Sequence, residues 1–126
     1  MENSKGCFIL LKDDFNNILL VQKGKKKSPG DWQLVGRDKK GKETNDKCIH
    51  NVIKENLNTL IFDLDEYKVI QDSKDENYAI YIGKIKDFMN LGKGVINSEW
   101  INSERLSTMV MDDFSKKVLE DYFSNL

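Results

Sequence analysis

The hydrophobic pattern of the first third of the chain predicts three short strands. Apolar runs at Gly6–Lys12 and Ile18–Lys23 flank a polar stretch rich in Asp and Asn, residues 13–17, which is typical of a β-hairpin. Ser28-Pro29-Gly30 then breaks the pattern, because proline fixes φ and glycine frees it. We expect a third strand at Asp31–Gly36, directly after this break.

A single long helix is predicted at Thr44–Leu60. Thr44 and the two residues after it offer side-chain oxygens that can cap the unpaired amides of a first turn. Apolar side chains then recur at steps of three and four residues, which places them on one helix face: Ile49, Val52, Ile53, Leu57 and Leu60. That face is expected to pack on a sheet.

The second half of the chain returns to strands and ends in another helix. Tyr67–Gln71 and Asn77–Ile85 flank a polar turn and predict a second hairpin, and Val95–Asn102 contains a last short strand. Ser103–Met109 fits a helical turn, and Asp112–Phe123 is amphipathic, with these residues facing inward: Phe114, Val118, Leu119, Tyr122 and Phe123. The order predicts an α/β fold, a mixed β-sheet between helices, in one domain spanning residues 1–126.

Composition agrees with one folded domain and excludes several classes of protein. The 126 residues are 39% hydrophobic and 33% charged, with one proline, which is typical of a soluble globular protein. No apolar run is long enough to span a bilayer, and Met1–Lys5 lacks the apolar core of a signal peptide. We therefore expect a cytoplasmic protein with no membrane partner. The net charge of −1 provides no overall field that would attract nucleic acid.

Three smaller features carry chemistry of their own. Cys7 lies in an apolar run and Cys48 in the helical pattern, so both are expected to be reduced and buried, and no further Cys or nearby His completes a metal-ligand set. His50 is the sole histidine and is expected to be structural or exposed. The lysines of residues 23–27 cluster around Gly24, either as a solvated hairpin end or as part of an anion-binding surface.

The chain resembles the Nudix (MutT-like) hydrolase superfamily along nearly its whole length. Trp32-Gln33-Leu34-Val35-Gly36 looks like the strand that leads into the family's Nudix box, without its proline. Near the C-terminus, Glu99-Trp100-Ile101 followed by Glu104-Arg105-Leu106 is similar to the family's tryptophan strand and leucine-bearing turn. The resemblance implies a Nudix-like α/β/α sandwich.

The Nudix box itself is only partly retained. It reads glycine, five residues, glutamate, seven residues, Arg-Glu, an apolar residue, any residue, Glu-Glu, any residue, glycine and an apolar residue. Glu43, Ile53 and Glu55 match this pattern. The other positions hold different residues: Arg37 at the first glycine, Asn51-Val52 at Arg-Glu, Asn56 at the second glutamate of the pair, and Asn58 and Thr59 at the last two positions.

The missing carboxylates bear directly on metal chemistry. Nudix enzymes hydrolyse a nucleoside diphosphate linked to another moiety, with Mg²⁺ held mainly by glutamates of the box helix. Positions 52, 55 and 56 lie within about 100° of helix arc, where three glutamates would form one acidic ledge. Here the ledge carries Val52, Glu55 and Asn56, and one carboxylate is few for a hard cation that prefers oxygen ligands.

The resemblance also nominates individual site residues. Glu55 is the candidate metal ligand, and Glu55, Glu43 and Glu76, the last in the second hairpin, are the candidate catalytic carboxylates for Mg²⁺ or Mn²⁺. On the usual pattern Glu43 pairs with an arginine that Asn51 replaces here. The cations that could border a phosphate-sized pocket are these: Lys23, Lys25 and Arg37. Arginine suits phosphate because its planar fork binds two oxygens.

Three functions remain open from the sequence. The first is a Nudix-fold protein that binds a nucleotide or nucleoside diphosphate derivative with little or no Mg-dependent hydrolysis. The second is a divergent hydrolase that holds one metal with Glu43, Glu55 and Glu76. The third is a protein- or RNA-interaction module, although RNA recognition favours exposed aromatics beside positive charge and only Phe15 lies near the lysine cluster. A homodimer is a further expectation from the family.

Overall fold

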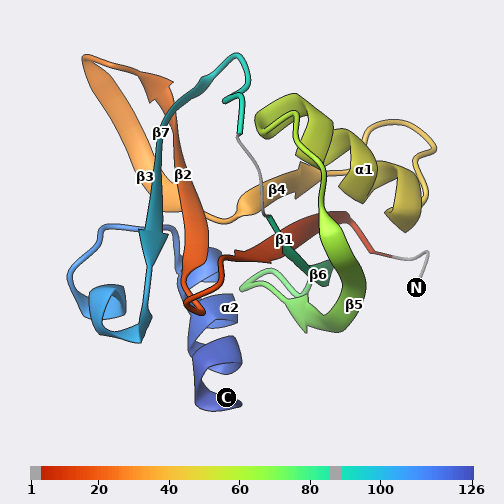
Figure 1. Cartoon of the computed structure of the whole chain (residues 1–126). Coiled ribbons are helices and arrows are strands. Elements are labelled where there is room, and N and C mark those ends of the chain that lie inside the picture. The colour runs from red at the N-terminus through yellow and green to blue at the C-terminus, as the bar shows by residue number, and fades with distance from the viewer. Residues whose placement is uncertain (1–3, 86–88) are drawn as a thin grey trace.

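The computed structural model describes residues 4–85 and 89–126. Residues 1–3, which belong to the N-terminal segment without the apolar core of a signal peptide, lie outside this range. Two α-helices, seven strands and one 3₁₀ helix follow one another in these described residues (Figure 1). In chain order they are β1 (Gly6–Lys12), β2 (Ile18–Lys25), β3 (Ser28–Gln33), β4 (Val35–Asp38), α1 (Asn45–Asn56), β5 (Phe62–Gln71), β6 (Asn77–Lys84), β7 (Val95–Ile101), η1 (Ser103–Ser107) and α2 (Asp113–Ser124).

The strands form one mixed sheet that divides into two halves. Neighbouring strands follow the order β3-β2-β1-β6-β5, with β7 paired to β2 and β4 paired to β1. The β1–β6 pair is parallel and the other pairs are antiparallel. The aligned partners of β1 and β2 are Lys12 and Ile18 at the turn of the hairpin, and beyond this point the two strands diverge (Figure 1).

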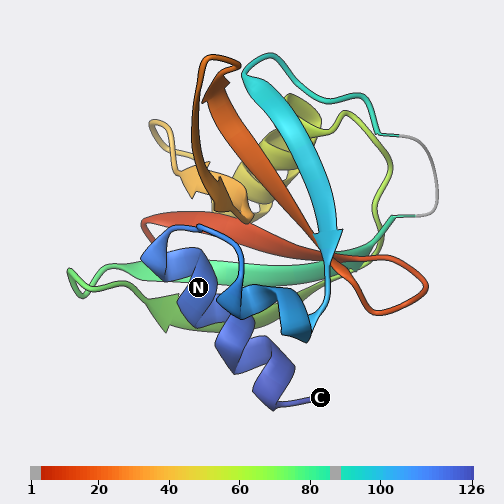
Figure 2. The ribbon, with the colours of Figure 1, turned by 90° about the vertical axis from the view of Figure 1, so that its left-hand side faces the viewer.

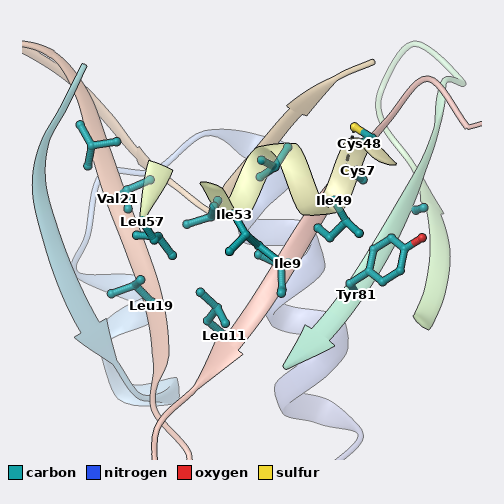
Figure 3. Close-up of a cluster of buried hydrophobic side chains, with 14 residues drawn as sticks. Cys7, Ile9, Leu11, Leu19, Val21, Cys48, Ile49, Ile53, Leu57 and Tyr81 are labelled. Carbon is teal, nitrogen blue, oxygen red and sulfur yellow. Dashed lines mark hydrogen bonds between the residues drawn. The ribbon is translucent and has the colours of Figure 1, made fainter. Parts of the chain in front are cut away.

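The helices lie on opposite faces of this sheet, each above its own hydrophobic cluster (Figures 1 and 2). α1 lies between the diverging strands β1 and β2, and Ile49, Ile53 and Leu57 pack against Ile9 and Leu19 there (Figure 3). α2 covers the other face, where its apolar side chains meet a second cluster that includes Leu10, Leu20 and Ile80. The predicted α/β/α arrangement with a mixed sheet is confirmed. None of the described helices is long and apolar enough to cross a membrane.

The strand predicted at Asp31–Gly36 is in fact two strands. β3 begins at Ser28, inside the predicted break, and pairs with β2, whereas β4 pairs with β1. Leu34 stands between them, fully buried, and its N–H donates to Ser115 Oγ of α2 at 2.9 Å. At this one residue the chain crosses from the half of the sheet that contains β2 to the half that contains β1. Local sequence preference does not predict such a crossing, because the residues on both sides of it are in strands.

The first helix is shorter than predicted and ends at Asn56 rather than Leu60. The N–H groups of Leu57 and Asn58 both donate to Ile53 O, and Asn58 adopts a positive φ of 42°. The Asn56 side chain turns back to donate to Val52 O at 2.8 Å. Leu60 consequently falls outside the helix and is 71% exposed. Thr44 caps the other end as predicted, accepting from Lys47 N–H.

Candidate functional site

Arg37 is the centre of the candidate site. It lies on β4, directly after Gly36, whose Cα is so close to β1 that a side chain there would collide with Cys7 O. The guanidinium is directed to two carboxylates at once and is only 15% exposed. Nη1 and Nη2 donate to Glu43 at 2.8 and 3.0 Å, and Nε and Nη2 donate to Glu55 at 2.9 and 3.1 Å.

Glu43 is held in place from three sides. Its oxygens accept from Arg37, from the backbone N–H of Lys40 at 2.7 Å and from Asn51 Nδ2 at 2.8 Å. Arg37, followed by these two further donors, holds the pKa of Glu43 well below its usual value. In the alignment that the sequence suggests, Asn51 takes the place of the arginine of the Nudix pattern; in the structure it is Arg37 of β4 that pairs with Glu43 as the cation. The sequence carried a signal for this exchange, because arginine at the first box glycine was itself a departure.

Glu55 is the more exposed of the two carboxylates. Its side chain is 44% exposed, against 12% for Glu43. Arg37 holds the pKa of Glu55 below its usual value, and partial burial opposes this shift. The two carboxylates together raise the pKa of Arg37, so the guanidinium stays charged. Arg37 therefore joins the loop before α1, through Glu43, to the last turn of α1, through Glu55.

Lys23 adds positive charge beside this pair. Burial lowers the pKa of the Lys23 ammonium group, whereas the negative charge of Glu55 raises it. The positive charges of Arg37 and Lys40 lower it further. The charges of Lys23, Arg37 and Lys40 therefore act on the same region as the Glu55 carboxylate. None of the hydrogen bonds and ion pairs of the described residues involves Lys23 Nζ. We call this group of Lys23, Arg37, Lys40, Glu43 and Glu55 the Arg37 site.

The Arg37 site does not fit a Mg²⁺ ion. Both oxygens of Glu55, and both of Glu43, already accept from the guanidinium. Val52 is fully buried in the first hydrophobic cluster and Asn56 is buried at the helix end, so neither offers a ligand. In residues 4–85 and 89–126 no three His, Cys, Asp or Glu side chains form a group that could hold a metal ion. Magnesium needs several oxygen ligands in near-octahedral geometry, which this set cannot supply.

Two of the predicted site residues lie apart from this group. Glu76 is in the β5–β6 turn, where Lys5 Nζ lies 3.8 Å from its carboxylate. Lys25 is at the exposed tip of the β2–β3 hairpin, opposite Ser28, and none of the hydrogen bonds or ion pairs of the described residues joins it to Glu43 or Glu55. His50 is exposed on α1, as expected. The structure thus brings together Lys23, Arg37, Glu43 and Glu55 of the residues that the sequence singled out.

A cavity of about 450 Å³ lies elsewhere on the molecule. It is lined by residues of β2, β3, β7 and the segment before α2, among them Trp32, Glu99 and Arg105. Trp32 packs against the second hydrophobic cluster, which α2 covers. The Arg37 site lies beside α1, which covers the first cluster. None of the Arg37 site residues lines this cavity.

The fold is shared with solved Nudix and MutT structures. The NUDIX domain of Shewanella oneidensis NrtR, in complex with ADP ribose, superposes with a TM-score of 0.75 at 13% identity, covering 95% of this chain and 86% of that one. An Ap4A hydrolase of C. elegans, in a binary complex, gives 0.74 at 13% identity, covering 96% and 97%. MutT from Methanosarcina mazei Go1 gives 0.70 at 13% identity, covering 95% and 92%.

Sequence comparison alone detects none of this. No family model and no curated protein sequence matches the chain. The structural likeness confirms the predicted Nudix-like α/β/α fold, and it does so over almost the entire chain.

Proposed function

We propose that the protein binds a nucleotide or nucleoside diphosphate derivative through its phosphates, and that it does so without Mg-dependent hydrolysis. The observation that carries this proposal is the position of Arg37. Its guanidinium lies between the two glutamates that match the Nudix box, within 2.8–3.1 Å of both carboxylates. A fixed cation of the chain thus neutralises the groups that a bound divalent cation would require.

The contacts of Arg37 suggest how a phosphate would be accommodated. Glu43 is nearly buried and has two further donors, so it anchors the guanidinium. Glu55 is more exposed and accepts side-chain donors from Arg37 only. A phosphate would compete with Glu55 for Nε and Nη2, and Lys23 and Lys40 would offset its remaining charge. Arginine suits this role because its fork matches two phosphate oxygens.

Two of the structural neighbours support a nucleotide-like ligand. One is the NUDIX domain bound to ADP ribose, and the other is the Ap4A hydrolase. Both share the fold over at least 95% of this chain. The ligand class proposed here is therefore one that proteins of this fold bind.

Two further expectations remain proposals. We propose that the protein is cytoplasmic. A homodimer stays a prediction, which sedimentation of the purified chain would check.

The decisive experiment uses Glu55→Gln and measures pyrophosphate and ADP-ribose binding by calorimetry in EDTA. If Glu55 competes with the ligand, its neutralisation should tighten binding roughly fivefold or more, since about 1 kcal/mol of like-charge repulsion is removed. Arg37→Met should weaken binding. Glu76→Gln is the matched control, because its carboxylate lies outside the Arg37 site, and it should leave affinity unchanged.

The hydrolase hypothesis makes the opposite prediction for the same variant. If Glu55 held a catalytic metal, Glu55→Gln would abolish Mg²⁺- or Mn²⁺-dependent phosphate release from nucleoside diphosphate derivatives. Turnover by the wild-type chain that is lost in Glu55→Gln would therefore overturn the proposal in favour of a divergent hydrolase.

A further inference from the structure

The two cysteines of the chain meet behind Arg37. Cys7 is on β1 and Cys48 is in the N-terminal half of α1, and both are fully buried in the first hydrophobic cluster. The Cys7 thiol donates to Cys48 Sγ with the sulfurs 2.9 Å apart, and Figure 3 shows the two side chains directed at each other. Residues 41 positions apart in sequence are thereby brought into direct sulfur–sulfur contact.

This contact is close to what a covalent bond requires. A disulfide has a sulfur–sulfur distance of about 2.0 Å, so the two atoms need to approach by roughly a further 1 Å. The chain holds no third cysteine that could compete as a partner. β1 and α1 are both anchored in the same cluster, which holds the two sulfurs next to each other.

We propose that Cys7 and Cys48 are a reversible oxidation site, which a hydroperoxide converts to an intramolecular disulfide. Cys48 thiolate attacks one peroxide oxygen and the O–O bond breaks, which gives a sulfenic acid; the departing hydroxide takes up the proton that the Cys48 thiol released and leaves as water. The Cys7 sulfur then attacks the Cys48 sulfur and expels a second water, its thiol proton going to the departing hydroxide. Two thiols and one hydrogen peroxide thus give one disulfide and two waters, and two electrons pass from the sulfurs to the peroxide.

The surroundings assign Cys48 as the attacking sulfur. The hydrogen bond that Cys48 accepts from Cys7 lowers the pKa of Cys48; burial opposes this shift, and the charge of Arg37 adds to it. Donating that hydrogen bond, together with burial, raises the pKa of Cys7. Arg37 Nη1 lies 3.8 Å from Cys48 Sγ. The thiolate is the reactive form of cysteine, and a neighbouring guanidinium favours it. In a reducing compartment such a pair is expected to be transient and redox-responsive rather than a permanent bridge.

The test measures thiols and mass in the full-length folded chain. Wild-type protein is incubated with hydrogen peroxide at 25 °C, then unfolded and alkylated. We expect both thiols to be lost together, so that the oxidised chain takes up no alkyl group. Its mass should be about 2 Da below that of the unmodified reduced chain, because two hydrogens are removed, and dithiothreitol should restore both thiols. The oxidised chain should remain monomeric in non-reducing electrophoresis. Its Tm should rise on the order of 5 °C or more, because the bridge closes a long loop.

Single variants show which sulfur reacts first. Cys7→Ser, which keeps a hydrogen-bond donor at position 7, should retain a Cys48 sulfenic acid that dimedone labels, whereas Cys48→Ser should label much more slowly. Two free thiols in folded wild-type protein after peroxide treatment would overturn the proposal. So would disulfides that join two chains, or sulfinic acid on Cys48 of wild-type protein without an internal bridge.

Discussion

Arg37 Nη1 lies 2.8 Å from Glu43 Oε1, and these two side chains are only 15% and 12% exposed. The pair ties β4 to the loop that enters α1, and Glu55 extends it to the last turn of the same helix. In the alignment that the sequence suggests, position 37 takes the place of the first glycine of the Nudix box, where no side chain would be present. The arginine side chain occupies the space beside Glu43 and Glu55, and its positive charge pairs with both carboxylates.

Removing this arginine should destabilise the protein. Arg37→Met keeps the aliphatic length but leaves Glu43 with little exposure and no cation. We expect Tm to fall on the order of 5–10 °C, as happens when one partner of a largely buried ion pair is lost. Differential scanning calorimetry checks this. Lys42→Met, in the same loop and exposed, is the control and should change Tm little; an equal fall in both variants would contradict the role of the pair.

Stability should also depend on pH through these carboxylates. Arg37 lowers the pKa of both Glu43 and Glu55 from the usual 4.5. A carboxyl whose pKa is lower in the folded state stabilises the fold above its unfolded-state pKa, and this contribution is lost as pH falls toward and through the folded value. Below about pH 5, wild-type stability should therefore fall more steeply than that of Arg37→Met.

Urea midpoints of both proteins at pH 7, 5 and 3 measure this effect. The gap between wild type and Arg37→Met should be full at pH 7 and should narrow by pH 3. A gap that stays constant over this range would show that the two carboxyls do not have lowered pKa values.

The sequence predicted the fold better than the site. Alternating apolar runs placed the strands, and the three- and four-residue spacing placed both helices, because burial on one face leaves a periodic trace. The division of one predicted strand at Leu34 left no such trace, since it depends on Ser115, far along the chain. The early end of α1 likewise depends on hydrogen bonds around Asn56 and Asn58 rather than on apolar spacing.

For the site, the sequence supplied the candidates but not their pairing. Arg37 was expected to face a phosphate and Glu55 to face a metal or solvent, yet the two bind each other. A pairing between a strand residue and a helix residue 18 positions away is set by how the loop folds. Glu76 was grouped with Glu43 and Glu55 by analogy alone, and it pairs instead with Lys5.

Val52 should not accept a carboxylate. Its side chain is fully buried among apolar neighbours, so Val52→Glu would place a charge in the hydrophobic cluster. We expect a loss of about 3 kcal/mol in the free energy of unfolding, measured by urea denaturation at pH 7. Lys54→Glu changes charge on the exposed side of the same helix and should stay within about 0.5 kcal/mol. If Val52→Glu were tolerated as well as Lys54→Glu, position 52 would instead face the Arg37 site.

Ser115 should be more important than a serine on a helix usually is. It is fully buried, and its hydroxyl accepts the N–H of Leu34 between β3 and β4. Ser115→Ala leaves that amide buried without a partner, which should cost about 1–3 kcal/mol. Ser107→Ala, at an exposed position of η1, is the matched control. Equal urea midpoints for the two variants would mean that the Leu34 amide finds another acceptor.

A metal-binding form of the Arg37 site would need more than one change in this chain, because Val52 is buried and Arg37 pairs with two carboxylates. Arg37→Gly alone would leave the Glu43 carboxylate without its ion-pair partner. Val52→Glu alone would put a charge into a hydrophobic cluster, and Asn56→Glu alone would remove the side chain that closes the helix end. Each single change lowers stability before any metal ligand set is complete. The side chains that keep a metal-ligand set from forming in this chain are therefore also side chains on which the stability of its fold depends.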